Sequence, residues 1–356
     1  MTSLDDLPLR RDLRGEKPYG APQLDVPVQL NVNENTFGIP EPVALEIVQR
    51  LAAEVIQLNR YPDREFMGLR SQLAAYLGHS LHAKQIWAAN GSNEVLMQIF
   101  QAFGGPGVKA MSFGPTYSMY PNIARISLTD YIQVDREVDY ELSAEYVAAE
   151  IRKINPGIVL LCSPNNPTGT PISLDVVRAA YDSFQGILIV DEAYAEFSDQ
   201  ESALSLLEGR ERLIISRTMS KAFAFAGARV GYLAACEAVV DALRIVRLPY
   251  HLSALTQAAA SAALDFAPLM LQNVEKIKVQ RDRIIAALTE FGLRPFRSDS
   301  NFVLVAGLEN PGDVFEKLLA RGVLIRNVGI PGTLRITAGT EAETTKLLAE
   351  LALILD

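Results

Sequence analysis

Short apolar runs alternate with helical segments through the middle of this 356-residue chain, and this alternation constrains the fold more than any other feature. The candidate strands are Ile86–Ala89, Lys109–Phe113, Ile158–Cys162, Ile187–Val190, Leu213–Ser216 and Val230–Ala234. The candidate helices are Ser92–Ala102, Ser143–Lys153, Ser173–Asp182 and a long run near Leu252–Asn273. Strands that alternate with helices predict an α/β fold whose mostly parallel sheet is covered by helices on both faces.

The two ends of the chain differ from this middle. Residues 1–40 are rich in Pro, Asn and Gly and lack periodicity, so we predict an irregular arm that lies along another surface. Residues 41–273, which begin with a helical apolar pattern over Glu41–Gln57, form the predicted large domain. Residues 274–356 carry a long helix and then strands Phe302–Val305, Val323–Arg326 and Leu334–Ala338 between helices, which predicts a smaller α+β domain.

Composition excludes several classes of protein. The formal net charge is −9 and no run of five basic residues occurs, which disfavours nucleic-acid binding. Two cysteines and three histidines exclude a disulfide scaffold, and we expect no metal site. The first 20 residues lack the apolar stretch of a secretory signal, and the apolar runs elsewhere are too short to cross a membrane. We therefore expect a cytoplasmic protein.

Polar residues follow five of the candidate strands, at the edge where doubly wound sheets bind ligands. After Ile86–Ala89, N-G-S-N-E (90–94) opens an apolar helix whose free N–H groups and dipole suit an anion. An ordinary capped helix start fits this segment as well. After Lys109–Phe113, Tyr117 could stack on a flat ring or simply pack in a turn.

The next three strand ends are more specific. S-P-N-N-P-T-G (163–169) holds Asn166 rigidly between prolines, which a structural turn does not need. Asp191 directly follows four apolar residues, so it is either a helix cap or a buried carboxylate that needs a cation or a protonated ring nitrogen. Lys221 lies between Ser220 and apolar residues, where desolvation would lower its pKa toward a reactive amine, although most lysines are solvated.

These five features together fit one ligand. A flat, phosphorylated pyridine aldehyde needs a helix N-terminus for its phosphate and an aromatic side chain over its ring. It also needs an amide at its ring oxygen, a carboxylate at its ring nitrogen and a lysine for a Schiff base. We therefore predict that the chain binds pyridoxal phosphate.

The same motifs, with D-E-A-Y-A-E-F (191–197) and A-G-A-R (226–229), resemble the fold type I pyridoxal-phosphate-dependent enzymes of the aspartate-aminotransferase superfamily. Further segments are similar to the histidinol-phosphate aminotransferase family, in particular its actinobacterial members. They include R-G-E-K-P-Y-G-A-P-Q-L (14–24), N-R-Y-P-D (59–63), W-A-A-N-G-S-N-E (87–94) and R-L-P-Y-H-L-S-A-L (247–255). The resemblance covers nearly the whole chain. It implies a seven-stranded sheet sandwiched by helices, an arm that packs with the small domain and the partner subunit, and a homodimer.

The resemblance also implies roles at the cofactor. Lys221 forms the Schiff base and moves the proton, and Asp191 pairs with the ring nitrogen. Asn166 and Tyr194 hydrogen-bond the ring oxygen, and Tyr117 stacks on the ring. The cofactor phosphate is held by a group of hydroxyl, amide and guanidinium side chains: Ser92, Asn93, Ser220, Arg229 and, from the neighbouring subunit, Tyr61.

At the substrate, the resemblance implies that Tyr19, Asn33, Arg326 and Arg335 hold the anionic end. The reaction implied is the reversible conversion of L-histidinol phosphate and 2-oxoglutarate to imidazole-acetol phosphate and L-glutamate, in histidine biosynthesis. One departure is visible, because Thr36 follows N-E-N (33–35) where the family often has proline.

Two other functions stay open at this stage, and a third is disfavoured. An aromatic amino-acid (phenylalanine) aminotransferase would share the fold and the chemistry. A decarboxylase or a carbon–sulfur lyase would share Lys221 and Asp191 but would need no 2-oxo acid. A ligand-sensing regulator would need a DNA-binding domain, for which the enzyme pattern and the acidic charge leave no room.

Overall fold

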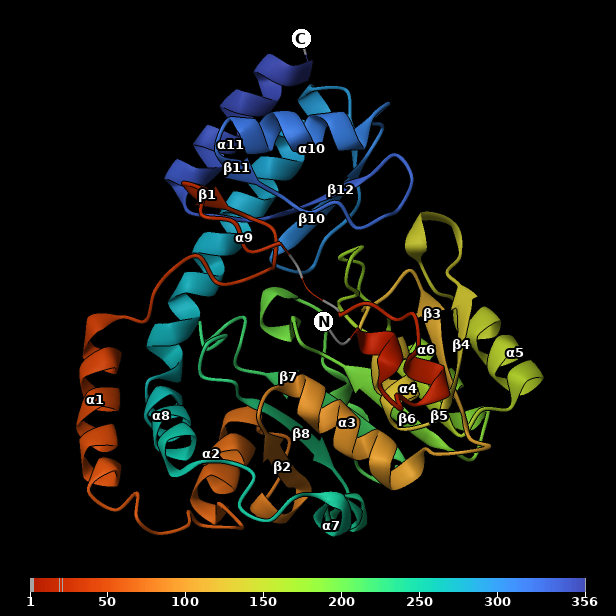
Figure 1. Ribbon diagram of the computed structural model, residues 1–356, viewed down its shortest axis with the longest axis vertical. Coiled ribbons are helices and arrows are strands. Elements are labelled where there is room, and N and C mark those ends of the chain that lie inside the picture. The colour runs from red at the N-terminus through yellow and green to blue at the C-terminus, as the bar shows by residue number, and fades with distance from the viewer. Residues whose placement is uncertain (1–2, 19, 21, 356) are drawn as a thin grey trace.

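The computed structural model describes residues 3–18, 20 and 22–355 (Figure 1). A sheet in the order β2-β8-β7-β6-β5-β3-β4 forms its centre. The strands are β2 (Ile86–Ala89), β3 (Lys109–Gly114), β4 (Asp130–Asp135), β5 (Ile158–Cys162), β6 (Ile187–Asp191), β7 (Leu213–Thr218) and β8 (Gly231–Ala235). β8 pairs antiparallel with β2 and β7, whereas the other pairings in this sheet are parallel. The mostly parallel seven-stranded sheet is therefore confirmed.

Burial explains which strands could be predicted from the sequence. Every residue of β5 and β6 is buried, and strands covered on both faces appear in the sequence as continuous apolar runs. β4 lies at the edge of the sheet and contains no fully buried residue. Its sequence, D-Y-I-Q-V-D, is therefore not a continuous apolar run and was not predicted as a strand. Its charged ends also suit an unpaired edge.

Helices pack on the sheet in two groups. α3 (Ser92–Phe103) contacts α4 (Tyr120–Ile126) and α7 (Glu237–Val246), while α5 (Ala144–Ile154) contacts α6 (Leu174–Asp182). Ser143 and Ser173 cap α5 and α6, and their hydroxyls accept hydrogen bonds from backbone N–H groups of the first turn. Short 3-10 turns occupy Leu4–Asp6, Arg11–Leu13, Ala83–Gln85, Val138–Tyr140, Ala195–Phe197 and Ala203–Leu206.

A further group of helices lies beside the sheet. α8 (Ala254–Asp265) packs against α1 (Glu41–Val55) and α2 (Met67–Leu77), and α9 (Ala267–Glu290) follows it. The single helical run that we predict near Leu252–Asn273 is wrong, because the chain bends by 76° between α8 and α9. Phe266 leaves the helical conformation there, and a proline in the first turn of α9 starts a new helix.

No helix in the described chain is by itself long and apolar enough to cross a membrane. Only the bent pair of α8 and α9, taken together, meets a test of length and composition.

α9 leads into a smaller unit at the top of Figure 1. Its antiparallel sheet has the order β12-β10-β9, from β9 (Arg294–Pro295), β10 (Phe302–Ala306) and β12 (Leu334–Thr337). α10 (Pro311–Ala320) and α11 (Glu341–Leu355) pack together. The boundary that we place after residue 273 falls inside α9 and stays a prediction.

The N-terminal arm is tied to this smaller unit. β1 (Val28–Gln29) pairs in parallel with β11 (Val323–Leu324), and the Thr337 N–H donates to the carbonyl of Leu30 at 3.1 Å. The arm then crosses to the carboxyl edge of the large sheet. Three separate segments therefore meet there: the arm, the sheet edge and the smaller unit.

Candidate active site

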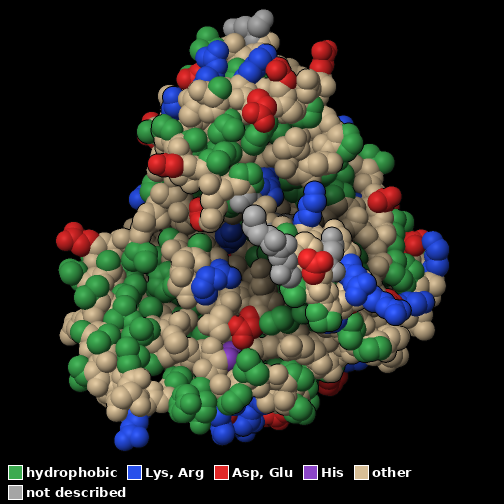
Figure 2. All heavy atoms as spheres, in the orientation of Figure 1, with side chains coloured by type: hydrophobic (Ala, Val, Ile, Leu, Met, Phe, Trp, Pro, Cys, Tyr) green, Lys and Arg blue, Asp and Glu red, His purple; other side chains and the backbone are tan. Residues whose placement is uncertain are grey.

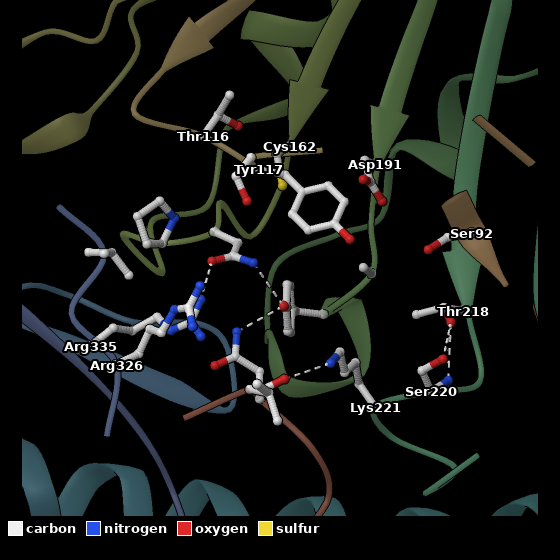
Figure 3. A pocket seen from close by; sticks show the side chains of 18 of the residues that line it. Ser92, Thr116, Tyr117, Cys162, Asp191, Thr218, Ser220, Lys221, Arg326 and Arg335 are labelled. Atoms are coloured by element: carbon white, nitrogen blue, oxygen red, sulfur yellow. Dashed lines mark hydrogen bonds between the residues drawn. The ribbon is translucent and has the colours of Figure 1, made fainter. Parts of the chain in front are cut away.

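A cavity of about 510 Å³ lies where these three segments meet. The predicted site residues that line it are Asn33, Ser92, Asn93, Tyr117, Asn166, Asp191, Tyr194, Ser220, Lys221, Arg229, Arg326 and Arg335. Parallel strands place their carboxyl ends at one edge, which is why residues that follow β2, β3, β5, β6 and β7 converge. Figure 3 shows Asp191 and Lys221 on the sheet side and both arginines on the opposite side.

Asp191 is the last residue of β6 and is buried at the bottom of the cavity. Tyr120 donates its hydroxyl proton to Asp191 Oδ2 at 2.8 Å. Oδ1 is buried without a hydrogen-bond partner among the described residues. Burial raises the pKa of this carboxyl to about 6, and the Tyr120 hydrogen bond opposes that rise only in part. The carboxylate therefore has one oxygen available for a cationic N–H.

Lys221 follows β7 and extends its amine into the same cavity. Its Nζ donates to the carbonyl of Val32 at 3.2 Å, so the arm provides its hydrogen-bond acceptor. Burial, and next the positive charge of Arg335, lower the pKa of Lys221 to about 8. A lysine with this pKa has a much larger neutral fraction at physiological pH than a solvated lysine, which suits a nucleophile or a general base.

Tyr194 lines the cavity and lies between two amide side chains. Its hydroxyl oxygen accepts hydrogen bonds from Asn33 Nδ2 at 3.0 Å and from Asn166 Nδ2 at 3.2 Å. Burial raises the pKa of Tyr194, so the phenol stays protonated. With its lone pairs occupied by two donors, the phenol directs its own proton toward a ligand oxygen.

The start of α3 forms a cradle for an anion. The N-cap is Gly91, at φ +87°, rather than Ser92, which is the first helical residue. A side chain at Gly91 would collide with the Arg229 guanidinium, so glycine permits that cation to approach the helix N-terminus. Ser220 lies on the same side of the cavity, where Thr218 Oγ1 donates to its hydroxyl at 3.0 Å.

Tyr117 lines the cavity beside this cradle. Its hydroxyl donates to Asn93 Oδ1 at 3.1 Å, and its ring meets Tyr120 edge-on at 5.5 Å between ring centroids. These contacts fix the phenol ring at the end of β3, which suits stacking on a planar ligand.

Arg326 and Arg335 form the opposite wall, on the smaller unit. Their backbones are paired in an antiparallel bridge with N···O distances of 3.0 and 2.8 Å, so both side chains lie on one face. Arg335 donates to Asn166 Oδ1 and to the Asn31 carbonyl, both at 2.7 Å. Like charges directly opposite each other are unfavourable, and an anion between them would relieve the repulsion.

Comparisons with known proteins agree with this geometry. Residues 26–351 match a family described as aminotransferase class I and II. A histidinol-phosphate aminotransferase of Paenarthrobacter aurescens (strain TC1) is 61% identical over 99% of this chain and 96% of that protein. The chain belongs to the histidinol-phosphate aminotransferase family. A second member, from Thermobifida fusca (strain YX), is 53% identical over 96% of this chain and 94% of that protein.

Solved structures of the histidinol-phosphate aminotransferase family have the same fold. The enzyme from Sinorhizobium meliloti, in complex with pyridoxal-5'-phosphate, superposes with a TM-score of 0.84 at 27% identity. That match covers 93% of this chain and 91% of the other. The predicted fold type I architecture is thus confirmed.

The described residues fit pyridoxal phosphate group by group. The unpartnered Asp191 Oδ1 can accept the ring N–H, and the cradle of Gly91 and Arg229 suits the phosphate. The Lys221 amine, with its lowered pKa, suits the aldehyde. Residues already in the cavity therefore supply each of these contacts.

One predicted site residue, Tyr61, is not in this cavity. Tyr61 is 80% exposed and stacks on Tyr250 with 4.5 Å between ring centroids. Its proposed contact with a neighbouring subunit stays a prediction. Tyr19 lies outside the described residues.

Several cavity residues were not singled out from the sequence. Thr116, Ser118, Thr218, Glu34 and the backbone of Asn31 and Val32 also line the cavity. Tyr120, which bonds Asp191, was missed as well. Helical spacing does not mark it, because Tyr117 precedes α4 and shares no helical face with Tyr120. No signal marks the Val32 carbonyl, because every residue carries one.

Proposed function

We propose that this chain transfers the amino group of L-histidinol phosphate to 2-oxoglutarate, with pyridoxal phosphate as its cofactor. The observation that carries the proposal is the meeting of three groups in one cavity: the Lys221 amine, the Asp191 carboxylate and the Arg326–Arg335 pair. The 61% identical relative bears the name of that activity. The reaction would yield imidazole-acetol phosphate and L-glutamate, as a step in histidine biosynthesis.

When bound, pyridoxal phosphate supplies an aldehyde that joins to amines and a ring that accepts the electrons released at the donor Cα. Lys221 Nζ would hold the aldehyde in the resting enzyme and, once displaced by the donor amine, would take the Cα proton and return it on the other side of the shifted bond. Asp191 would keep the ring nitrogen protonated, and Tyr194 would donate its proton to the ring oxygen.

The arginine pair would hold the anionic end of each substrate in turn. A guanidinium can bind either a phosphate or a carboxylate in a bidentate manner, so one wall can serve both histidinol phosphate and 2-oxoglutarate. Because each half-reaction uses the same wall, the donor product must leave before the acceptor enters, which predicts ping-pong kinetics.

The assay is the direct comparison of two donors. The protein loaded with pyridoxal phosphate is given 2-oxoglutarate with either histidinol phosphate or phenylalanine, and glutamate formation is measured. We expect kcat/KM to favour histidinol phosphate by at least about 100-fold, because a phosphate dianion can engage both guanidinium groups. A preference for phenylalanine would make the chain an aromatic aminotransferase. Release of CO₂ or ammonia without the 2-oxo acid would indicate a decarboxylase or a lyase.

We also propose a homodimer. Large apolar side chains are exposed along α1, in the turn after it and at the end of α7: Leu45, Val48, Val55, Ile56, Leu58, Tyr61, Ile245 and Leu248. In Figure 2 hydrophobic side chains gather on the side of the molecule that carries α1. Exposed apolar side chains that gather on one side of a molecule mark an interface.

Mixing two inactive variants tests the role of Tyr61 across that interface. If Tyr61 serves the neighbouring site, Lys221→Ala and Tyr61→Ala chains form mixed dimers in which one site is intact. Random reassortment then restores about a quarter of wild-type activity, because half of the dimers are mixed and each has one good site. No recovery in dimers shown to have exchanged chains would place Tyr61 in its own site or in no site.

The cytoplasm is the compartment that we propose. The two cysteines, Cys162 and Cys236, are both free thiols. Free thiols suit a reducing compartment.

A further inference from the structure

Tyr120 lies directly behind Asp191, outside the cavity lining, and is completely buried as the first residue of α4. Its hydroxyl donates to Asp191 Oδ2 at 2.8 Å, and its ring contacts the ring of Tyr117 edge-on. One side chain therefore contacts both of the groups that we place around the pyridine ring.

The two oxygens of Asp191 have different surroundings. Oδ2 accepts the Tyr120 hydrogen bond, whereas Oδ1 has no hydrogen-bond partner among the described residues. A carboxylate can rotate about its Cβ–Cγ bond and present either oxygen. A donor fixed at one oxygen stops that rotation and leaves the second oxygen for a ligand.

We propose that Tyr120 is a positioning residue for the cofactor, whose hydroxyl orients the Asp191 carboxylate so that Oδ1 receives the ring N–H of pyridoxal phosphate. The inference rests on the proposed function, which supplies the pyridine ring. Tyr120 acts through Asp191 and does not itself contact the ligand. Its effect should therefore depend on the ring nitrogen and on nothing else in the cofactor.

Among the described side chains around this pair, Tyr120 is the one that donates to Asp191, and the backbone N–H of Ala193 also favours the charged carboxylate. Cys162, at the end of β5, stays a neutral thiol because burial raises its pKa to about 12. Glu192 directs its carboxylate to Arg217, at 2.7 Å, and to Ser202. Arg136 faces Tyr120 and Cys162 but donates to the backbone carbonyls of Phe113 and Tyr140, at 3.2 and 3.0 Å. Burial raises the pKa of Tyr120 far above its usual range, so its proton stays in place.

The test compares two ligands on Tyr120→Phe. One is pyridoxal phosphate, and the other is its analogue in which CH replaces the ring nitrogen. Both can form the Schiff base, but only the first can donate an N–H to Asp191. Because the hydrogen bond that Tyr120 supports involves charged groups, we expect Tyr120→Phe to weaken the affinity for pyridoxal phosphate about tenfold or more. The affinity for the analogue should change less than about twofold, since the bond that Tyr120 supports is absent.

Tyr131→Phe is the matched control. The Tyr131 hydroxyl is hydrogen-bonded to Ser112 between β4 and β3, outside the cavity lining. This variant also loses a tyrosine hydrogen bond inside the same sheet layer, but it should leave both affinities unchanged. The ¹⁵N chemical shift of labelled cofactor is a second measurement. It should move toward the unprotonated value in Tyr120→Phe and not in Tyr131→Phe.

The outcomes separate the two proposals. Failure of the wild-type protein to bind pyridoxal phosphate would overturn the proposed function. Normal wild-type binding, with Tyr120→Phe weakening both ligands equally or neither, would overturn the role of Tyr120. Should the single variant fold poorly, the double variant Asp191→Asn, Tyr120→Phe decides the matter. Its affinity for pyridoxal phosphate should equal that of Asp191→Asn alone, and a further loss would contradict the inference.

Discussion

Two clusters of buried charge lie side by side at the ends of β6 and β7, and they differ in how their charges are compensated. Asp191 and Lys221 face the cavity, without an ion-pair partner in the described part of the chain. Glu192, the next residue after Asp191, pairs instead with Arg217, which also contacts Glu196 at 3.3 Å. Ser202 and the Ala203 N–H complete the contacts of Glu192, each at 2.7 Å.

This difference in charge compensation indicates which of the two clusters binds a ligand. Burial would lower the pKa of Arg217, but Glu192 and Glu196 outweigh it and raise that pKa, so the guanidinium is held charged. In the cavity, burial dominates and moves the pKa of Asp191 up to about 6 and that of Lys221 down to about 8. A buried charge with partners stabilises structure, whereas a buried charge without them is kept for a ligand.

The largest expected effect is that of Lys221→Met on the cavity cluster. Transamination should fall by at least about 10³-fold, because both the covalent link and the general base are lost. The cofactor-free protein should become more stable at pH 7 by about 1–2 kcal/mol, because a folded-state pKa below the unfolded value makes the buried ammonium destabilising there. Assays and denaturant unfolding measure the two effects. Lys84→Met, at an exposed site, should change neither.

Arg217→Met, in the neighbouring cluster, should have the opposite effects: it should lower stability and leave activity nearly unchanged. Two carboxylates would lose their cation while buried, so the free energy of unfolding should fall by about 3–5 kcal/mol. Because the side chain does not line the cavity, the kcat of the remaining folded protein should stay within about threefold of wild type. A large loss of kcat without a loss of stability would mean that the two clusters are not separate in function.

Arg326→Gln would sharpen the comparison at the far wall. We expect KM for histidinol phosphate to rise about 10- to 100-fold with kcat changed much less, since an anion contact made equally in the ground and transition states is lost. Steady-state kinetics with both substrates measures this. Arg321→Gln removes an exposed arginine that pairs with Glu350 and should leave KM unchanged.

The smallest effects concern pH and Asp191. Below its pKa of about 6 the carboxyl is neutral, so its contribution to cofactor affinity should fall about tenfold per pH unit in the wild type but not in Asp191→Asn. Stability of the cofactor-free protein moves the other way. Because its folded-state pKa lies above the unfolded value, the Asp191 carboxyl stabilises the folded protein at low pH. This stabilisation is lost as the pH rises through about 6.

Asp191→Asn should therefore be more stable than wild type at pH 7, by about 2 kcal/mol, with the gain vanishing near pH 4. Unfolding curves of both proteins at several pH values measure it. Equal stability at every pH would mean that Asp191 is solvated or paired in solution.

Much of the fold and of the candidate site could be predicted because the signals are local. The strands β2 and β5 have the predicted bounds, since a doubly buried strand must be apolar along its whole length. The residues that follow the strands could be grouped because parallel strands end at one edge. The bend at Phe266 and the edge strand β4 were missed, since alanine-rich sequence fits one helix or two and an edge strand can be polar.

The sequence by itself predicted which residues follow the strands, and it singled out the lysine, the carboxylate and the two arginines that line the cavity. Only the tertiary structure decided which of two adjacent acids, Asp191 or Glu192, keeps an oxygen free, and which backbone carbonyl receives Lys221. The physical reason is that residue type fixes which groups can ionise or donate. Desolvation and partnership depend on which distant segments meet, here the arm, the sheet edge and the smaller unit.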